Sequence, residues 1–302
     1  MGAPALTKGS VFFDAAKTGQ SFDHLKPEDF AFLDAWFNDC DGCLLDSETL
    51  AMGDLGRKVH EGLIAAGFNG EFDLPGFITG YAGWHAKNIV EDFAAKTGVT
   101  PDLDKIVAAH KLSVIETLAR DVQTFEGMDK VLALLTAGAK HGSAVVTSSE
   151  VARVQPGLEK NSLFVNFVKD GVTHLYSGPD VMTALLKADP TSPFKLKPSP
   201  DIYLHAADAM GVDIARTGTF EDSLSGARSA VAAGIGYIIG FVGGSHIPHN
   251  GKEEHARKLL EIGVHRVVRD VRAIPLAILD IHRERQLALK PTLAADRPGA
   301  AP

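Results

Sequence analysis

The 302-residue sequence contains only two cysteines, Cys40 and Cys43, too few for a disulfide framework. It also has no excess of positive charge, because 30 Lys and Arg stand against 38 Asp and Glu, a formal net charge of −8. We therefore expect no nucleic-acid partner and no membrane partner. A small anionic substrate is not excluded, because a phosphate pocket depends on local charge and on a bound metal.

Long apolar runs are absent as well. The longest candidate, GYIIGFV at 236–242, is short and contains glycine, which is typical of a buried strand rather than of a membrane span. The first 20 residues lack a basic region followed by an apolar run, so we expect no signal peptide and a cytoplasmic protein. The chain is long enough for one large core together with a smaller domain.

Short apolar segments alternate with helical patterns over most of the chain. Such alternation is typical of an α/β fold with a mainly parallel sheet. Residues 50–120 interrupt it, since they are mostly helical with apolar residues spaced by three and four. We predict an N-terminal extension at 1–34, an α/β core at 35–48 and 125–282, an inserted helical cap at 49–124, and a disordered tail at 283–302.

Polar side chains cluster at the ends of the predicted strands, where ligands bind in parallel α/β sheets. A hydroxyl pair, a lysine and paired carboxylates at neighbouring strand ends suit phosphoryl transfer at a magnesium ion, which prefers hard oxygen ligands. The cation would offset repulsion between a carboxylate nucleophile and an anionic phosphate. The residues at these ends are Asp39, Asp41, Thr147, Ser148, Lys195, Lys197, Glu221 and Asp222.

Four stretches resemble, in order, the four motifs of the haloacid dehalogenase superfamily: DCDGCLLDSE, VVTSS, LKPSPD and FEDSLSG. The helical block resembles the cap of the phosphoglycolate phosphatase and β-phosphoglucomutase branch. The segments FVGGSHIPH and LLEIGVHRVV resemble sugar-phosphate phosphatases of that branch, such as 6-phosphogluconate phosphatase-like proteins. The resemblance implies a HAD-like Rossmannoid parallel sheet with an inserted α-helical cap, a Mg²⁺ cofactor and a small-molecule phosphate ester as substrate.

The resemblance also implies catalytic roles. Asp39 would attack phosphorus and form an aspartyl-phosphate. Asp41 would protonate the leaving oxygen and then activate water. Thr147 would hydrogen-bond the transferring group, and Lys197 would neutralise its charge.

For the metal, the resemblance implies carboxylate ligands from Asp39 and Asp222 and a backbone carbonyl from Asp41. Glu221 would bind the metal directly or through water. Gly42 would let the chain turn tightly past the phosphate, and the amide of Ser148 would help to cradle it.

Ordinary structural interpretations compete with these roles. The first aspartates could form a solvated turn, and the last acidic pair could simply begin a helix. Thr147 could instead cap a helix. In that case Ser148 could make the side-chain hydrogen bond to the transferring group. Lys195 is the rival of Lys197, but only Lys197 immediately precedes Pro-Ser-Pro-Asp. The four motifs together favour the functional interpretation.

The cap stretch ITGYAGWHAKN, 78–88, lies where this branch often places a substrate-specificity loop. Trp84, His85 and Lys87 are therefore candidate substrate-binding residues, although Trp84 could pack a helix start and Lys87 could be solvated. We interpret His246 and His249 as structural or exposed, because a histidine pair without further ligands is weak evidence for a metal.

Residues 178–197 exceed the usual connection before the third motif and could add a helix near the active site or at a subunit contact. The extension at 1–34 has no functional interpretation, and the sequence gives no indication of oligomeric state. The C-x-x-C spacing is incidental, since no further cysteines complete a zinc site. A buried Cys43 would pack as a small hydrophobe.

The sequence thus predicts a phosphoric monoester hydrolase acting on a sugar or sugar-acid phosphate. One alternative is a phosphohexomutase of the same branch. The run Asp46-Ser47-Glu48-Thr49-Leu50 favours the phosphatase, because such mutases tend to carry Asp-Thr and then a histidine there. A dehalogenase would need no magnesium and would lack the second aspartate. A catalytically silent sugar-phosphate-binding protein would not need a paired nucleophile and acid.

Overall fold

The computed structural model describes residues 11–13, 21–81 and 86–289. Its centre is a six-stranded parallel sheet with the strand order β5-β2-β1-β6-β7-β8, which confirms the predicted α/β class. The strands are β1 (Trp36–Asn38), β2 (Ser143–Thr147), β5 (Leu175–Ser177), β6 (Gly218–Glu221), β7 (Tyr237–Phe241) and β8 (Arg266–Val268).

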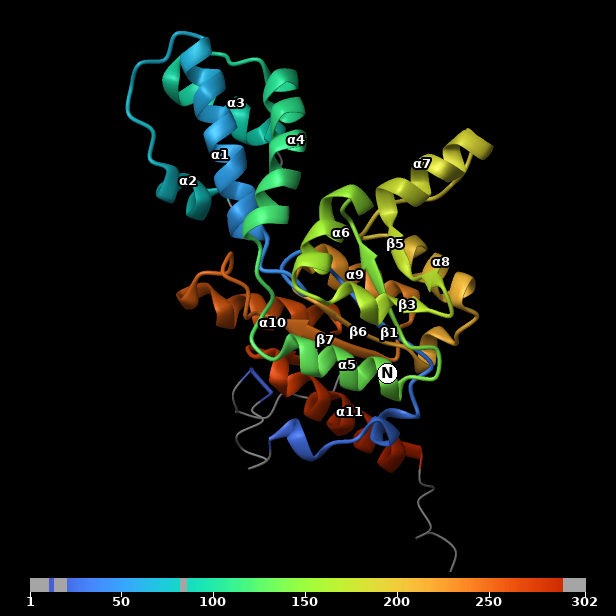
Figure 1. Ribbon diagram of the computed structural model, residues 1–302. Helices are drawn as coiled ribbons and strands as arrows, with labels where there is room; N and C mark the ends of the chain where they lie inside the picture. Colours follow the sequence, from blue (N-terminus) through green and yellow to red (C-terminus); the bar gives the residue numbers. More distant parts are fainter. Residues whose placement is uncertain (1–10, 14–20, 82–85, 290–302) are drawn as a thin grey trace, which may run out of the picture.

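Helices cover both faces of the sheet (Figure 1). Successive side chains of a strand point to opposite faces, so Trp36 and Val145 join one hydrophobic cluster while Phe37 and Val146 join the other. The first cluster includes helices α5 (Met128–Gly138), α6 (Val151–Lys160) and α11 (Ile274–Leu289), and the second includes α8 (Asp201–Met210), α9 (Leu224–Ala233) and α10 (Lys252–Ile262). Burial on both faces explains why the strands read as continuous apolar runs.

Four helices form a separate unit between β1 and β2, above the carboxyl ends of the strands (Figure 1). They enclose their own hydrophobic cluster, in which Val59, Leu63 and Phe77 are buried. Helix α1 packs along α4, and the side chains of Asp73 and Asp102 cap the starts of α2 and α4. The helices are α1 (Glu48–Ala65), α2 (Leu74–Gly80), α3 (Ala86–Thr97) and α4 (Leu103–Asp121). The domain boundaries at 49 and 124 stay a prediction.

The two chain segments that join this cap to the core run side by side. Leu45 and Thr124 form an antiparallel bridge, and the Asp46 amide donates to the Gln123 carbonyl at 2.9 Å. Asp46 Oδ1 also accepts hydrogen bonds from the amide and the hydroxyl of Ser245, in the loop after β7. The cap is therefore joined to the core by a paired connector, the two hydrogen-bonded segments at 45–46 and 123–124, rather than by two separate loops.

Several elements were not anticipated from the sequence. The edge strand β5 and the short hairpin of β3 (Val168–Lys169) and β4 (Val172–Thr173) lie between the second and third motifs. The long connection at 178–197 does contain a helix, α7 (Gly178–Ala188), which projects from the end of β5 (Figure 1). No helix in the described ranges has the length and apolar composition that crossing a membrane requires.

Both ends of the described chain contain helices that pack on the core. Within the predicted extension, the short helices η2 (Phe22–His24) and η3 (Pro27–Phe30) bury Phe22 and Phe30 in the same cluster as Trp36. At the other end, α11 continues to Leu289, so the prediction of disorder is wrong for residues 283–289. Its inner face carries Ile278 and Ile281, whose burial against the core extends the helix.

Candidate active site

Three adjacent strands bring the predicted residues to one edge of the sheet. Strand β1 lies between β2 and β6, and Asn38 pairs in register with both Val145 and Phe220. The residues that follow these strands therefore come together, as the rule for parallel sheets requires. They open into a cavity of about 850 Å³ between core and cap, whose core lining includes Asp39, Asp41, Thr147, Ser148, Ser149, Arg153, Asp222 and His246.

Lys197 forms the centre of a buried ionic network. Its Nζ atom lies 2.8 Å from Asp39 Oδ1 and 2.7 Å from Glu221 Oε1, and it donates to the Val146 carbonyl at 2.9 Å. The Tyr203 hydroxyl donates to the same Glu221 oxygen. The lysine side chain is only 3% exposed. The structure thus places Lys197 beside Asp39, whereas Lys195 is exposed.

Burial and charge oppose each other in this network. Burial raises the pKa of Asp39 well above its usual value, and Glu221 and Asp222 add to the rise against the effect of Lys197. Burial alone would lower the pKa of Lys197, but Asp39 and Glu221 outweigh it, so that the pKa is raised. The lysine is therefore a firmly held cation, and Asp39 is a carboxylate that depends on nearby positive charge to remain ionised.

Asp41 lies in a different environment, formed largely by residues that the sequence interpretation missed. Its carboxylate accepts from Ser47 Oγ at 2.5 Å and from Ser149 Oγ, and Arg153 Nη2 lies 3.4 Å from Oδ1. Burial would raise the pKa of Asp41, but Arg153 and the two serines outweigh it and lower the pKa. Arg153 is in the first turn of α6, directly after the second motif, which is the signal that could have identified it.

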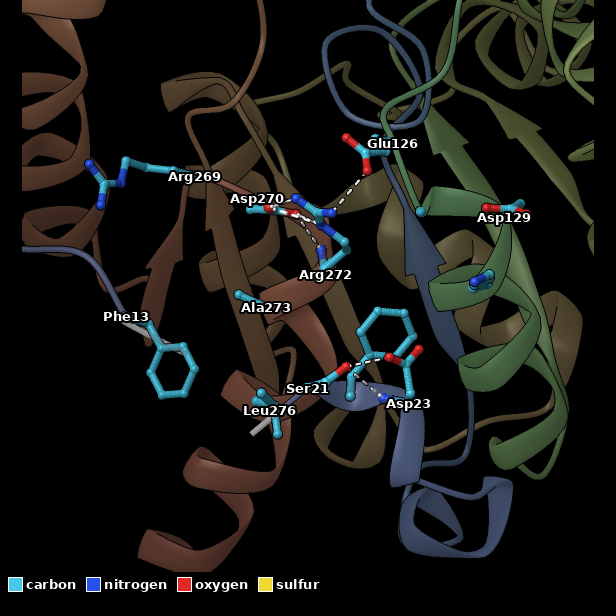
Figure 2. Close-up of a pocket in the computed structure, with 13 residues that line it drawn as sticks. Phe13, Ser21, Asp23, Glu126, Asp129, Arg269, Asp270, Arg272, Ala273 and Leu276 are labelled. Carbon is cyan, nitrogen blue, oxygen red and sulfur yellow. Dashed lines mark hydrogen bonds and ion pairs between the residues drawn. The ribbon is translucent and has the colours of Figure 1, made fainter. Parts of the chain in front are cut away.

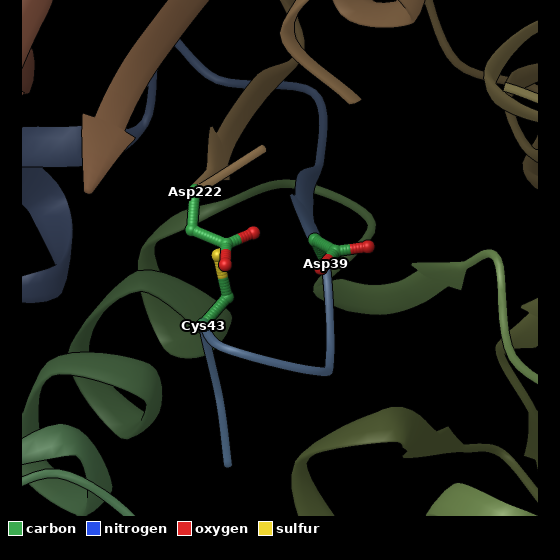
Figure 3. Close-up of side chains that lie close together, drawn as sticks. All are labelled: Asp39, Cys43 and Asp222. Atoms are coloured by element: carbon green, nitrogen blue, oxygen red, sulfur yellow. The ribbon is translucent and has the colours of Figure 1, made fainter. Parts of the chain in front are cut away.

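A group of potential metal ligands lies at the turn after β1 (Figure 3). Ligand atoms of Asp39, Cys43 and Asp222 all lie within 4.8 Å of one another. Gly42 has a φ of +75°, and an added Cβ would lie 2.0 Å from Asp222 Oδ2, so only glycine fits there. The two carboxylates are hard donors suited to magnesium. Burial raises the pKa of the Cys43 thiol well above its usual value, so the softer sulfur stays protonated.

Glu221 is not part of this ligand group in the structure. Its Oε1 atom is taken by Lys197 and Tyr203, and its side chain is fully buried. These contacts of Glu221 hold the lysine, and its role as a metal ligand, directly or through water, stays a prediction.

Two histidines flank Asp222. His246 Nε2 lies 3.1 Å from Asp222 Oδ2, and His255 Nε2 lies 2.6 Å from the Asp222 carbonyl oxygen. Burial alone would lower the pKa of His246, but Asp222 outweighs it and raises the pKa. His246 thus lines the cavity beside Asp222, whereas His249 is exposed.

The remaining predicted residues have varied surroundings. Thr147 is buried, and its hydroxyl accepts from the Ser149 amide at 3.0 Å, while Ser148 is exposed to the cavity. Lys87 is exposed and lies 3.7 Å from Glu91, and it is not part of the cavity lining. Trp84 and His85 lie outside the described residues.

A second cavity of about 660 Å³ lies between the N-terminal segment, the start of α5 and the region after β8 (Figure 2). Arg272 contacts both Asp270 and Glu126 across it. Its described lining includes none of the motif residues, whereas Asp39, Asp41, Thr147 and Asp222 line the first cavity.

Comparisons with known proteins agree with this geometry. A family model described as "Hydrolase: haloacid dehalogenase-like hydrolase" matches residues 33–234. The 6-phosphogluconate phosphatase of Escherichia coli (strain K12) is 24% identical over 203 residues, covering 67% of this chain and 80% of that protein.

The β-phosphoglucomutase of Mycobacterium bovis is 31% identical over 166 residues, and the match spans 53% of this chain and about half (54%) of that relative. Among solved structures, a conserved haloacid dehalogenase-like protein of Agrobacterium tumefaciens strain C58 is 28% identical with a TM-score of 0.63, covering 83% of this chain and 99% of that one.

Proposed function

Because the chain belongs to the haloacid dehalogenase-like hydrolase family, we propose that it is a magnesium-dependent phosphatase of a small phosphorylated metabolite. The substrate class is a sugar or sugar-acid phosphate, which the names of the relatives, 6-phosphogluconate phosphatase and β-phosphoglucomutase, support. The observation that carries the proposal is the convergence of Asp39, Asp41 and Asp222 on one cavity, with Lys197 held against Asp39.

The proposed nucleophile is Asp39. Lys197 contacts its Oδ1 atom, which leaves Oδ2 for attack on phosphorus. A bond forms between Oδ2 and phosphorus as the bond to the leaving oxygen breaks, giving an aspartyl-phosphate. Lys197 neutralises charge on the transferring group, and Thr147 and Ser148 contribute hydrogen bonds to it. Glu221 holds the lysine in place.

Asp41 is the proposed acid and base. It protonates the leaving oxygen and later takes a proton from the water that attacks the aspartyl-phosphate. Arg153, Ser47 and Ser149 lower the pKa of Asp41 in the present arrangement, so its resting form is the base. To act as the acid, Asp41 must therefore first take up a proton from solvent, which requires it to leave these contacts when substrate binds.

Asp39 and Asp222 would hold Mg²⁺ together with the carbonyl oxygen of Asp41. Two carboxylates at a turn too tight for any residue but Gly42 suit a hard cation. When bound, the ion supplies the positive charge that lets a carboxylate approach an anionic phosphate. A cation at this place would lower the pKa of Asp39, which burial raises.

The proposal is tested by measuring phosphate release from a panel of phosphorylated sugars, sugar acids and unrelated metabolites with Mg²⁺. We expect turnover of at least one sugar or sugar-acid phosphate, its loss on chelation with EDTA, and its recovery when Mg²⁺ is restored. Full activity after rigorous metal removal would contradict the metal assignment. Absence of turnover with retained ligand binding would indicate the silent binding protein instead.

A phosphohexomutase is the second candidate, favoured by the relative named β-phosphoglucomutase. In that case the aspartyl-phosphate would return its phosphoryl group to a sugar hydroxyl rather than to water. The same panel separates the two, because a mutase yields an isomeric sugar phosphate with little free phosphate.

A further inference from the structure

A carboxylate outside the four motifs is buried inside the cap. Asp54 lies in the middle of α1, and its side chain is only 4% exposed. It accepts hydrogen bonds from His110 Nδ1 at 2.8 Å, from Ser113 Oγ at 2.6 Å and from Thr117 Oγ1 at 3.3 Å. The three donors lie three and seven residues apart on α4, so they share the helix face that packs against α1.

This cluster joins two helices at a high cost in desolvation free energy. A buried charge must be compensated by every contact around it, and an apolar pair of similar size would hold α1 and α4 at least as well. Burial would raise the pKa of Asp54, but hydrogen bonds from Ser113 and His110 outweigh it, so the pKa is lowered. Asp54 is therefore ionised and can only accept hydrogen bonds, which points to a task for the residue that it orients.

That residue is His110, which lines the active-site cavity from the cap side. The roof of this cavity is otherwise mostly apolar. Its described residues are Glu48, Ala51, Met52, Leu55, Ala86 and His110. Glu48 begins α1 beside the core, so among the described residues His110 is the polar group that the body of the cap presents to a bound molecule.

The contact with Asp54 determines which ring nitrogen of His110 carries the proton. Because an ionised carboxylate accepts, Nδ1 must donate, and a neutral ring then has a lone pair on Nε2. Burial lowers the pKa of His110 despite the opposing effect of Asp54, so the ring is neutral near pH 7. Nε2 has no hydrogen-bond partner among the residues that the structure describes.

We infer that His110 Nε2 accepts a hydrogen bond from a hydroxyl group of the bound phosphate ester, with Asp54 as the positioning residue. The inference rests on the proposed function and deepens it, since it assigns a substrate class. The cavity would favour polyhydroxylated phosphate monoesters over esters that lack a hydroxyl at this place. A site that hydrogen-bonds a substrate hydroxyl discriminates strongly against analogues without it.

The test compares two esters, the best sugar phosphate of the panel and p-nitrophenyl phosphate, which has no aliphatic hydroxyl. For His110→Ala we expect kcat/KM for the sugar phosphate to fall about 10- to 100-fold, mainly through KM, because one buried hydrogen bond is lost. The value for p-nitrophenyl phosphate should change less than about 2-fold. His110→Gln, whose amide oxygen can accept, should restore part of the loss.

Asp54→Asn tests the positioning role. The asparagine amide can donate to Nδ1, which moves the ring proton to Nε2 and replaces the acceptor by a donor. We expect the same selective loss as for His110→Ala. Ser113→Ala is the matched control, because it removes one donor to Asp54 but keeps the Asp54–His110 contact. It should lower stability without changing the preference between the two esters.

Nitrogen NMR of labelled protein reads the tautomer directly and does not depend on turnover. We expect the Nδ1–H form in the wild type and the Nε2–H form in Asp54→Asn. An Nε2–H form in the wild type, or an equal loss for both esters in His110→Ala, would overturn the inference. If the wild type hydrolyses neither ester, the proposed function fails, and the tautomer still decides whether His110 presents an acceptor.

Discussion

The core and the cap bury charge in different ways. In the core, Lys197 is enclosed with Asp39 and Glu221, and these groups come from three separate segments of the chain. In the cap, Asp54 accepts hydrogen bonds from three side chains of a single neighbouring helix, and the partly exposed Arg57 of its own helix lies 3.5 Å from Oδ1. The core network concentrates opposite charges beside the proposed nucleophile, whereas the cap cluster holds one neutral ring. The comparison separates the groups proposed to perform the chemistry from the group proposed to recognise the substrate.

The largest difference should appear when the proposed nucleophile is changed. For Asp39→Asn we expect phosphate release to fall by at least about 10⁴-fold, as for the loss of other catalytic nucleophiles. Steady-state phosphate release measures this, and circular dichroism checks the fold. Asp104→Asn, on an exposed position of α4, should behave as the wild type. Wild-type turnover in Asp39→Asn would remove the aspartyl-phosphate mechanism.

Removing the lysine tests whether the core network is also structural. Lys197→Met would leave Asp39 and Glu221 buried without their shared cation, so we expect the free energy of unfolding to fall by about 3–5 kcal/mol. Denaturant titration provides the measurement. Lys195→Met is the matched control, because that residue is exposed two positions away. An unchanged midpoint in Lys197→Met would mean that the carboxylates are not held ionised.

Hydrophobic substitutions test whether cap and core are energetically separate. Phe77 is buried in the cap cluster and Phe37 in a core cluster. Each change to Ala should cost about 3 kcal/mol or more, because a large cavity is created. Hydrogen exchange should show Phe77→Ala lowering protection in α1–α4 alone, and Phe37→Ala lowering it in the sheet. Equal loss of protection in both regions after Phe77→Ala would show that the two units unfold together.

The smallest expected effect is a loss of folding stability at acidic pH. His265 Nδ1 accepts from the Ile238 amide at 3.0 Å, and burial, aided by Arg285 and Arg266, lowers its pKa from 6.5 to about 4. The folded state therefore binds fewer protons than the unfolded state between these values. Stability from this group is present above pH 6.5 and is lost as the pH falls to about 4, by up to about 3 kcal/mol. Denaturant titrations of His265→Asn should show a flatter pH profile, and an unchanged profile would contradict the assignment.

The sequence allowed the core site to be predicted because its residues immediately follow strands. Once β1, β2 and β6 are adjacent, the positions of Asp39, Thr147 and Asp222 follow from the ends of those strands. The orientation of side chains between helices could not be predicted in this way. Asp54 and His110 are 56 residues apart, and their contact depends on the rotation of α1 against α4.

Other features were missed because their local signal is weak. The three residues of β5 are too few to show a period, and the strand exists because β2 offers it an edge. Arg153 lies outside the second motif, in the first turn of the helix that follows it, so the motif alone did not predict it. Lys87 was predicted to bind substrate because of its place in a resembling loop, but in the structure it lies on the surface beside Glu91.

The paired connector at Leu45 and Thr124 has a consequence for protein engineering. A segment whose entry and exit lie side by side can be cut out and replaced without moving the chain on either side. The cap is thus an exchangeable insertion. A foreign four-helix unit joined at this bridge would lie over the same core residues, Asp39 and Lys197. Recognition could be exchanged in one step while the reaction chemistry is left in place.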